Sequence, residues 1–204
     1  MLSTTLGELV EAGNGFIQTG PFGSQLHARD YVDEGVPVVM PQQLGDNEVT
    51  RIGIAQIREQ DRDRLRRHVM RIGDVVFSRR GDVTRRAYIG PEEDGWLCGT
   101  GCLLVRLEHP RCDTRYLARY FGTHEIKNYL IQHAVGATMP NLNQGILASV
   151  PVRLPTIDEQ LRVVEIFSTY DGLIENNRRR IELLEQSARL LYKEWFVHLR
   201  FPGY

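Results

Sequence analysis

The last quarter of the chain carries its longest regular pattern of apolar and polar positions. From residue 156 to residue 199 there is one glycine, Gly172, and no proline. Thr156 and Glu159 have the spacing of a capping box, and Asp158 adds negative charge to the first turn, so the pattern predicts a helix that begins here. At 1.5 Å per residue this helix would be roughly 60 Å long, which is more than a compact domain of this size needs.

Apolar residues recur along this predicted helix with the heptad spacing of a coiled coil. One member of the pattern, Asn177, is polar, as is common where register and partner number are fixed. We therefore expect the helix to pack against something outside its own domain; the alternative is a solitary helix that lies back on that domain. The expected seam consists of Phe167, Tyr170, Ile174, Asn177, Ile181, Leu184, Ala188, Leu191 and Trp195.

The rest of the chain mixes short apolar runs, typical of strands, with stretches of helical period. Strands are expected near residues 36–40, 73–77, 87–89, 96–107 and 150–154, and helical segments near 6–17, 57–70, 114–121 and 124–134. This order predicts an α+β fold in two parts. Residues 1–154 would form a globular domain with a twisted, mostly antiparallel sheet and flanking helices, and residues 155–204 a long C-terminal coiled-coil helix.

Composition places the chain among ordinary globular proteins. Its 204 residues are 42% hydrophobic and 25% charged, with a net charge of -1. No apolar run reaches transmembrane length and no signal-peptide pattern follows Met1, which predicts a cytoplasmic protein. Three cysteines, Cys98, Cys102 and Cys112, cannot form a disulfide framework. They lack zinc-ribbon spacing, so buried thiols are expected rather than ligands, with no metal and no cofactor.

Positive charge is concentrated in one region of this nearly neutral chain. Residues 51–86 hold eleven arginines against five acidic residues, an excess of six. Arginine suits bidentate contacts with phosphate and with guanine. We expect nucleic-acid contacts from the loop between two predicted strands, although base composition of the genome or a solvated helix face would also explain the arginines. The candidates are Arg79, Arg80, Thr84, Arg85 and Arg86.

Two other polar segments could face a nucleic acid. Residues 136–144 contain no acidic residue and offer Thr138, Asn141 and Asn143, whose side chains can contact base edges. Residues 20–26 form a glycine-rich turn in which Ser24 and Gln25 could contact phosphates or bases. The alternative for this turn is a plain structural role with Phe22 in the core.

Motifs for catalysis are missing from the sequence. There is no Pro-Pro pair, as the catalytic motif of a DNA or RNA methyltransferase would need, and no Gly-Lys-Ser/Thr of a P-loop. For a metal nuclease, the single carboxylate-x-lysine candidate is Glu125 with Lys127, in a stretch of helical period. The six histidines have no metal-ligand spacing. The sequence therefore favours a binding protein over an enzyme.

Five segments, in this order, resemble the specificity subunits of type I restriction-modification systems, and together they span nearly the whole chain. Tyr31 and residues 35–39 (GVPVV) add to the first of them. The segments are 20–26 (GPFGSQL), 73–81 (GDVVFSRRG), 136–143 (GATMPNLN), 151–160 (PVRLPTIDEQ) and 191–196 (LYKEWF).

This resemblance implies a subunit that is not itself catalytic. Residues 1–154 would be a target recognition domain that reads one half of a split DNA sequence. Residues 155–204 would be a spacer helix that docks the methyltransferase subunits, and a motor and nuclease subunit would join the complex indirectly. The resemblance therefore agrees with a helix that is too long for its own domain.

The chain departs from the family in copy number. Family members usually carry two recognition domains and two spacer helices, whereas this sequence has one of each, so it is either a natural half subunit or part of a longer one. We expect a homodimer in which antiparallel C-terminal helices rebuild the two-domain arrangement and read an interrupted palindrome. The rival hypotheses are an assembly or adaptor protein that acts through its coiled coil, and a nuclease that uses Glu125 and Lys127.

Overall fold

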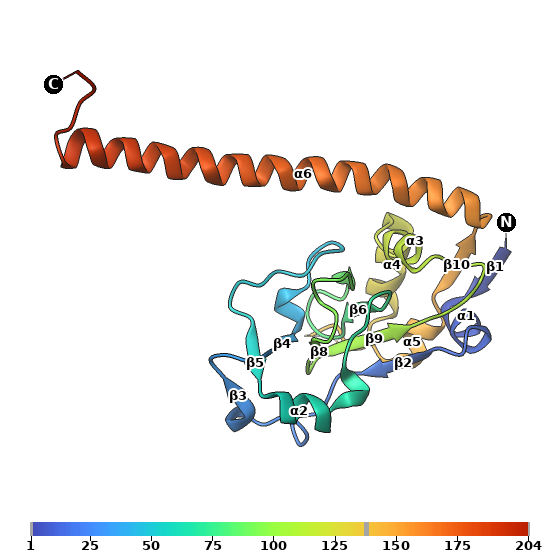
Figure 1. The fold of residues 1–204 in the computed structure, drawn as a ribbon. Helices are drawn as coiled ribbons and strands as arrows, with labels where there is room; N and C mark the ends of the chain where they lie inside the picture. The colour runs from blue at the N-terminus through green and yellow to red at the C-terminus, as the bar shows by residue number, and fades with distance from the viewer. Residues whose placement is uncertain (1, 137–138, 204) are drawn as a thin grey trace. The chain divides into compact units, whose positions relative to one another are not determined.

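The computed structural model describes residues 2–136 and 139–203. The chain divides into two compact units, Met1–Leu161 and Arg162–Tyr204, which we call the globular unit and the helical unit. Figure 1 shows short strands and helices in the globular unit and a single long helix that begins there and continues into the helical unit. The expected α+β class with a long C-terminal helix is confirmed.

Short strands make up three sheets in the globular unit. The first pairs β1 (Leu2–Thr5) with β10 (Pro151–Leu154). The second sheet is antiparallel throughout, and its strands lie in the order β2 (Phe16–Thr19), β9 (Cys102–Arg106), β6 (Val75–Ser78) and β7 (Arg86–Tyr88). The third sheet has the order β3 (Tyr31–Val32), β5 (Ala55–Ile57), β4 (Val36–Val39) and β8 (Leu97–Cys98). Its strands β4 and β8 form a parallel pair.

Five short helices lie between these strands: α1 (Leu6–Ala12), α2 (Glu59–Arg64), α3 (Thr114–Tyr120), α4 (His124–His133) and α5 (Gln144–Ala148). Capping side chains fix where three of them begin, and Asn143 caps α5. Thr5 and Glu8 form a capping box at α1, and Asp113 accepts hydrogen bonds from the Arg115 and Tyr116 amides at α3.

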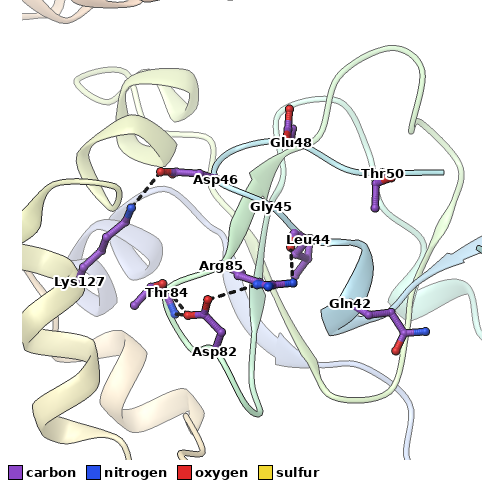
Figure 2. A pocket seen from close by; sticks show the side chains of 10 residues that line it. All are labelled: Gln42, Leu44, Gly45, Asp46, Glu48, Thr50, Asp82, Thr84, Arg85 and Lys127. Carbon is purple, nitrogen blue, oxygen red and sulfur yellow. Dashed lines mark hydrogen bonds and ion pairs between the residues drawn. The ribbon is translucent and has the colours of Figure 1, made fainter. Parts of the chain in front are cut away.

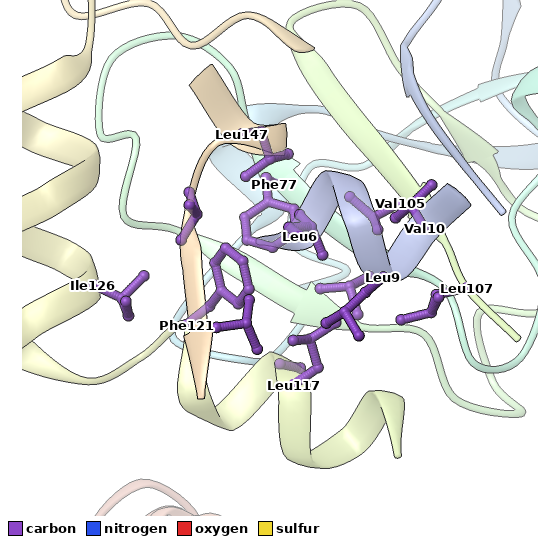
Figure 3. Close-up of a cluster of buried hydrophobic side chains, with 14 of the residues drawn as sticks. Leu6, Leu9, Val10, Phe77, Val105, Leu107, Leu117, Phe121, Ile126 and Leu147 are labelled. Atoms are coloured by element: carbon purple, nitrogen blue, oxygen red, sulfur yellow. The ribbon is translucent and has the colours of Figure 1, made fainter. Parts of the chain in front are cut away.

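The second sheet separates two apolar cores because neighbouring side chains of a strand point to opposite faces. All four residues of β6 are buried. Val75 and Phe77 pack into a core with the helices, where the ring of Phe77 meets that of Phe121 edge to face at 4.9 Å (Figure 3). Val76 packs on the other side, in a core shared with Val39 of the third sheet.

The long helix α6 (Ile157–Tyr192) begins as its sequence predicts. The Thr156 amide donates to Glu159 Oε2 at 2.9 Å, and the Glu159 amide donates to Thr156 Oγ1 at 3.4 Å, which completes the capping box. In the first turn, the buried Gln160 accepts from the Asp113 amide and donates to the Arg111 carbonyl. The two compact units therefore divide inside the helix, after Leu161, whereas the sequence suggested residue 154 as the boundary. A π-helical turn, Lys193–Val197, follows the helix.

Two local expectations differ from the structure. Residues 57–70 hold the end of β5, the short α2 and a 3-10 turn, Arg66–His68, in place of one longer helix, and no side chain of α2 is buried. The helix α5 was not expected; it begins where Asn143 Oδ1 accepts from the Ile146 amide at 2.8 Å.

In the described part of the chain, no helix is both long enough and apolar enough to span a membrane.

Candidate nucleic-acid interface

Residues 79–85 form the loop between β6 and β7, and we call them the arginine loop because they include Arg79, Arg80 and Arg85. Its backbone is anchored at both ends, since the Ser78 amide donates to the Arg85 carbonyl at 2.9 Å and the Arg79 amide to the Gly101 carbonyl at 2.8 Å. Val83, in the middle of the loop, is buried in the core with the helices. Arg80 and Arg85 are exposed and Arg79 is half-buried. The fold thus holds a short loop firmly while leaving two arginines open to a ligand.

A second polar segment is joined to this loop by backbone hydrogen bonds. The Leu142 amide donates to the Arg79 carbonyl at 2.8 Å, and the Gly81 amide to the Pro140 carbonyl at 3.2 Å. In addition, Arg79 Nε donates to Asn141 Oδ1 at 3.2 Å, across 62 residues of sequence. We call residues 79–85 and 139–142 the joined loops. They bring Arg79 and Arg80 beside Asn141, and Arg85 lies at the other end of the same loop.

Two candidates from the second segment have other outcomes. Thr138 lies outside the described residues. Asn143 is exposed, but its side-chain oxygen Oδ1 caps α5. A ligand could therefore contact the side-chain NH2 group of Asn143, or it would have to displace the cap.

The glycine-rich turn lies next to the same region. Gly20 approaches the backbone so closely that a Cβ would lie 1.9 Å from the Gly99 carbonyl oxygen, which explains the glycine. The adjoining Thr100 hydroxyl donates to the Pro21 carbonyl at 2.8 Å. The Gly101 carbonyl accepts from the Arg79 amide, so residues 99–101 link the turn to the joined loops.

Inside this turn, the buried anchor is Leu26, while Phe22 is 56% exposed, so the alternative that placed Phe22 in the core is wrong. Gln25 Oε1 accepts from the Phe22 amide at 3.1 Å, and the Gln25 carbonyl accepts from Arg64 Nη1 at 2.7 Å. Ser24 and Gln25 are both exposed. The turn is thus a fixed feature of the surface with two accessible polar side chains.

Arg86 is a correction to the expected set. It is the first residue of β7, and only 2% of it is exposed. Its guanidinium donates to the Ala118 carbonyl and to the Asp46 carboxylate. Gly122 leaves the room for it, since a Cβ there would lie 1.9 Å from Arg86 Nη2. Burial lowers the pKa of Arg86 and Asp46 partly offsets this, but an arginine stays charged, so Arg86 is a buried ion-pair residue, in contrast to the exposed Arg80 and Arg85.

Beside the joined loops lies an open hollow of about 420 Å³ (Figure 2). One side comes from the arginine loop, which contributes Asp82, Thr84 and Arg85, and the other from a segment between β4 and β5. Sequence reasoning missed that second segment, because its polar residues carry no motif. Its lining residues are Gln42, Leu44, Gly45, Asp46, Glu48 and Thr50, and Lys127 of α4 completes the set.

Asp82 organises the arginine side of the hollow. Its carboxylate accepts from the Thr84 hydroxyl at 2.6 Å and from Arg85 Nε at 3.2 Å. Burial alone would raise the pKa of Asp82, but these hydrogen bonds and the charge of Arg85 outweigh it and lower the pKa. The carboxylate is therefore ionised at neutral pH.

The residues considered for metal or catalytic chemistry have structural roles. Cys98, Cys102 and Cys112 are free and buried, and burial raises the pKa of the Cys112 thiol to about 12. Within residues 2–136 and 139–203, no three histidine, cysteine or acidic side chains gather as a metal site would need. Glu125 forms an ion pair with Arg153 and Lys127 forms one with Asp46. The nuclease hypothesis therefore gains no geometric support.

The family model for the type I restriction modification DNA specificity domain matches residues 4–186. The chain belongs to this family. Relatives that share its sequence include the MjaIX type I restriction enzyme specificity subunit of Methanocaldococcus jannaschii, 34% identical over 84 residues, or 41% of this chain and 19% of that protein. The HindI specificity subunit of Haemophilus influenzae is 23% identical over 128 residues, or 61% and 28% of the two chains.

A solved structure shares the fold of this specificity domain. The crystal structure of a type I restriction-modification system S subunit from M. genitalium superposes with a TM-score of 0.65 at 16% identity and covers 97% of this chain. The match takes up 46% of that protein. The chain thus spans less than half the length of these relatives.

In this specificity domain, the expected seam of α6 is exposed. The exposed fractions of its large apolar side chains run from 44% at Phe167 to 68% at Leu184. Asn177 and Ala188 are exposed as well, and Trp195 is half-buried with its ring 6.5 Å from that of Phe201. A run of exposed apolar side chains of this length is typical of a surface that binds another protein.

Proposed function

We propose that this chain is the DNA sequence-recognition subunit of a type I restriction-modification complex in the cytoplasm. The observation that carries the proposal is the junction of the joined loops, where Arg79 and Arg80 pair with Asn141 and the same loop carries the exposed Arg85. Arginine and asparagine side chains are the types that contact phosphates, guanine and adenine. Membership of the DNA specificity domain family supports the same assignment.

In this proposal the subunit is not an enzyme. Methyl transfer and cleavage belong to methyltransferase subunits, which dock on α6, and to a motor and nuclease subunit that joins through them. The names of the relatives, specificity subunits of type I restriction enzymes, support such a division of labour.

The helix α6 would bring two recognition units together. Ile174, Ile181 and Leu184 are more than half exposed, and burying one such side chain contributes about 1.5–3 kcal/mol. Two antiparallel copies would bury these residues against each other and hold two globular units at a set distance. Each unit would then read one half of a bipartite, palindromic target.

Light scattering tests the pairing. Wild type should be a dimer at micromolar concentration. Ile174→Lys with Ile181→Lys should raise the dissociation constant by at least about 100-fold, since charges replace two apolar side chains of the seam in each copy. Leu183→Lys is the control, because Leu183 is 54% exposed but lies outside the seam. A wild-type monomer at tens of micromolar would contradict the proposed homodimer.

Gel shifts on duplex DNA test the recognition surface. Wild type should bind with an affinity that falls as salt rises. Replacing Arg79, Arg80 and Arg85 by alanine should weaken binding and flatten the salt slope by roughly one unit for each phosphate that is no longer neutralised. Arg153→Ala, which removes an exposed arginine of β10, should leave the slope unchanged.

The same assay, with and without the methyltransferase subunit, separates the rival functions. Absence of salt-dependent binding in both cases would favour an adaptor that acts through α6. Metal-dependent cleavage by the isolated chain would favour a nuclease instead.

A further inference from the structure

The hollow beside the joined loops has a mixed polar lining without an excess of positive charge. Three of its residues are acidic, Asp46, Glu48 and Asp82, against the two cations Arg85 and Lys127, and the buried Arg86 also pairs with Asp46. Charges of both signs therefore balance, and no positive excess is left to attract a phosphate. A base edge suits such a lining better, because it carries hydrogen-bond donors and acceptors side by side and no net charge. The amide of Gln42 and the hydroxyl of Thr50 add further donors and acceptors to the lining.

Arg85 is held in a defined orientation at this hollow. Its Nε donates to Asp82 Oδ2 at 3.2 Å and its Nη1 to the Leu44 carbonyl at 3.4 Å (Figure 2). Asp82 is itself fixed by the Thr84 amide at 3.1 Å and by the Thr84 hydroxyl. The side chain of Arg85 nevertheless stays 46% exposed. An oriented guanidinium loses less conformational entropy on binding than a freely moving one, and its planar donors match a pair of acceptors.

The neighbouring Arg80 provides a contrast within one loop. It is exposed like Arg85, but it does not line the hollow. An exposed arginine near DNA can neutralise phosphate irrespective of sequence, whereas an arginine fixed beside a polar hollow can distinguish one base from another.

We propose that Arg85 reads a guanine in the target half-site, that Asp82 is its positioning residue, and that the hollow receives the major-groove edge of this G·C pair. This inference rests on the proposed function, and it specifies one base of the DNA sequence that the subunit would recognise. Guanine offers O6 and N7 to the guanidinium, and the amino group of the paired cytosine is a donor that suits a carboxylate of the lining.

The test selects binding sites from a randomised duplex library with the full chain, alone and with a methyltransferase subunit. Wild type should select sites with one invariant G·C pair that depends on Arg85. Arg85→Ala should lower the preference at that position by about 5- to 150-fold and leave the other positions unchanged. Asp82→Asn should weaken the same preference in part, because the orienting charge is removed while the arginine remains.

Two variants separate base reading from charge. Arg85→Lys keeps the positive charge but lacks the planar pair of donors, so it should lose the guanine preference and keep the salt slope. Arg80→Ala should weaken binding to all sequences alike and keep the preference.

The outcomes distinguish this inference from the proposed function. If wild type selects a sequence and Arg85→Ala and Arg85→Lys select the same sequence with the same discrimination, Arg85 does not read a base, while DNA recognition stands. If wild type shows no salt-dependent binding to any duplex, alone or with the methyltransferase subunit, both are overturned.

Discussion

The two units of this chain use their apolar residues in opposite ways. In the globular unit, Leu117 and Phe121 are at most 1% exposed and pack into a core on one face of the second sheet. In the helical unit, Ile181 and Leu184 are 55% and 68% exposed. A folded domain gains most of its stability by burying such side chains. The first unit therefore buries large apolar side chains within itself, while those of the second unit lie exposed.

The largest expected effect compares the loss of stability at two leucines, Leu117 in α3 of the globular unit and Leu183 in α6 of the helical unit. Leu117→Ala in α3 should lower the free energy of unfolding by about 2–5 kcal/mol, because it leaves a cavity in the core. Leu183→Ala in α6 should cost less than about 1 kcal/mol, since Leu183 is exposed and outside the seam. Urea unfolding measures both. Equal losses of stability would show that the two units do not differ as described.

Two neighbouring arginines make the same comparison inside the globular unit. Arg86→Ala should lower the free energy of unfolding by about 2–3 kcal/mol, because it removes a buried cation and leaves the Ala118 carbonyl without its donor. Arg85→Ala should change it by less than about 0.5 kcal/mol, because that side chain is nearly half exposed. Thermal unfolding of both variants checks this. A greater destabilisation by Arg85→Ala would reverse the assignment of structural and binding roles.

A smaller effect concerns the cap of α3 and depends on pH. Hydrogen bonds from Arg115 and the Tyr116 amide outweigh the effect of burial and lower the pKa of Asp113 below 3.8. A lowered pKa means that the carboxylate stabilises the fold above pH 3.8 and loses this effect as the pH falls through the folded value. Asp113→Ala should cost about 1 kcal/mol at pH 7 and progressively less at acidic pH. Urea unfolding at a series of pH values measures this, and a cost that stayed constant at acidic pH would contradict the role of the Asp113 carboxylate.

Local sequence rules predicted the features that depend on neighbouring residues. The capping box of Thr156 and Glu159 marked where α6 begins. The heptad seam stays a prediction, because apolar residues outside it, such as Leu173 and Leu183, are exposed as well. The buried run of β6 followed from its continuous apolar residues. These features need only a few consecutive positions, so a single sequence contains the information.

Other features depend on residues far apart in the chain. Arg85 and Arg86 look alike in sequence, and only the packing of Gly122 and Asp46 around Arg86 assigns it to the interior. The junction of the joined loops spans 62 residues. Likewise, Gln42 and Thr50 reach the hollow because β4 and β5 bring their segment beside the arginine loop. No pattern within either segment indicates these contacts.

The sequence that the intact chain selects from random duplexes, measured together with its footprint, tests the central claim most directly. A recognition unit paired through the seam of α6 predicts an inverted repeat of two identical half-sites, separated by a spacer of fixed length with no base preference. Selection of a single uninterrupted or asymmetric site would contradict this account.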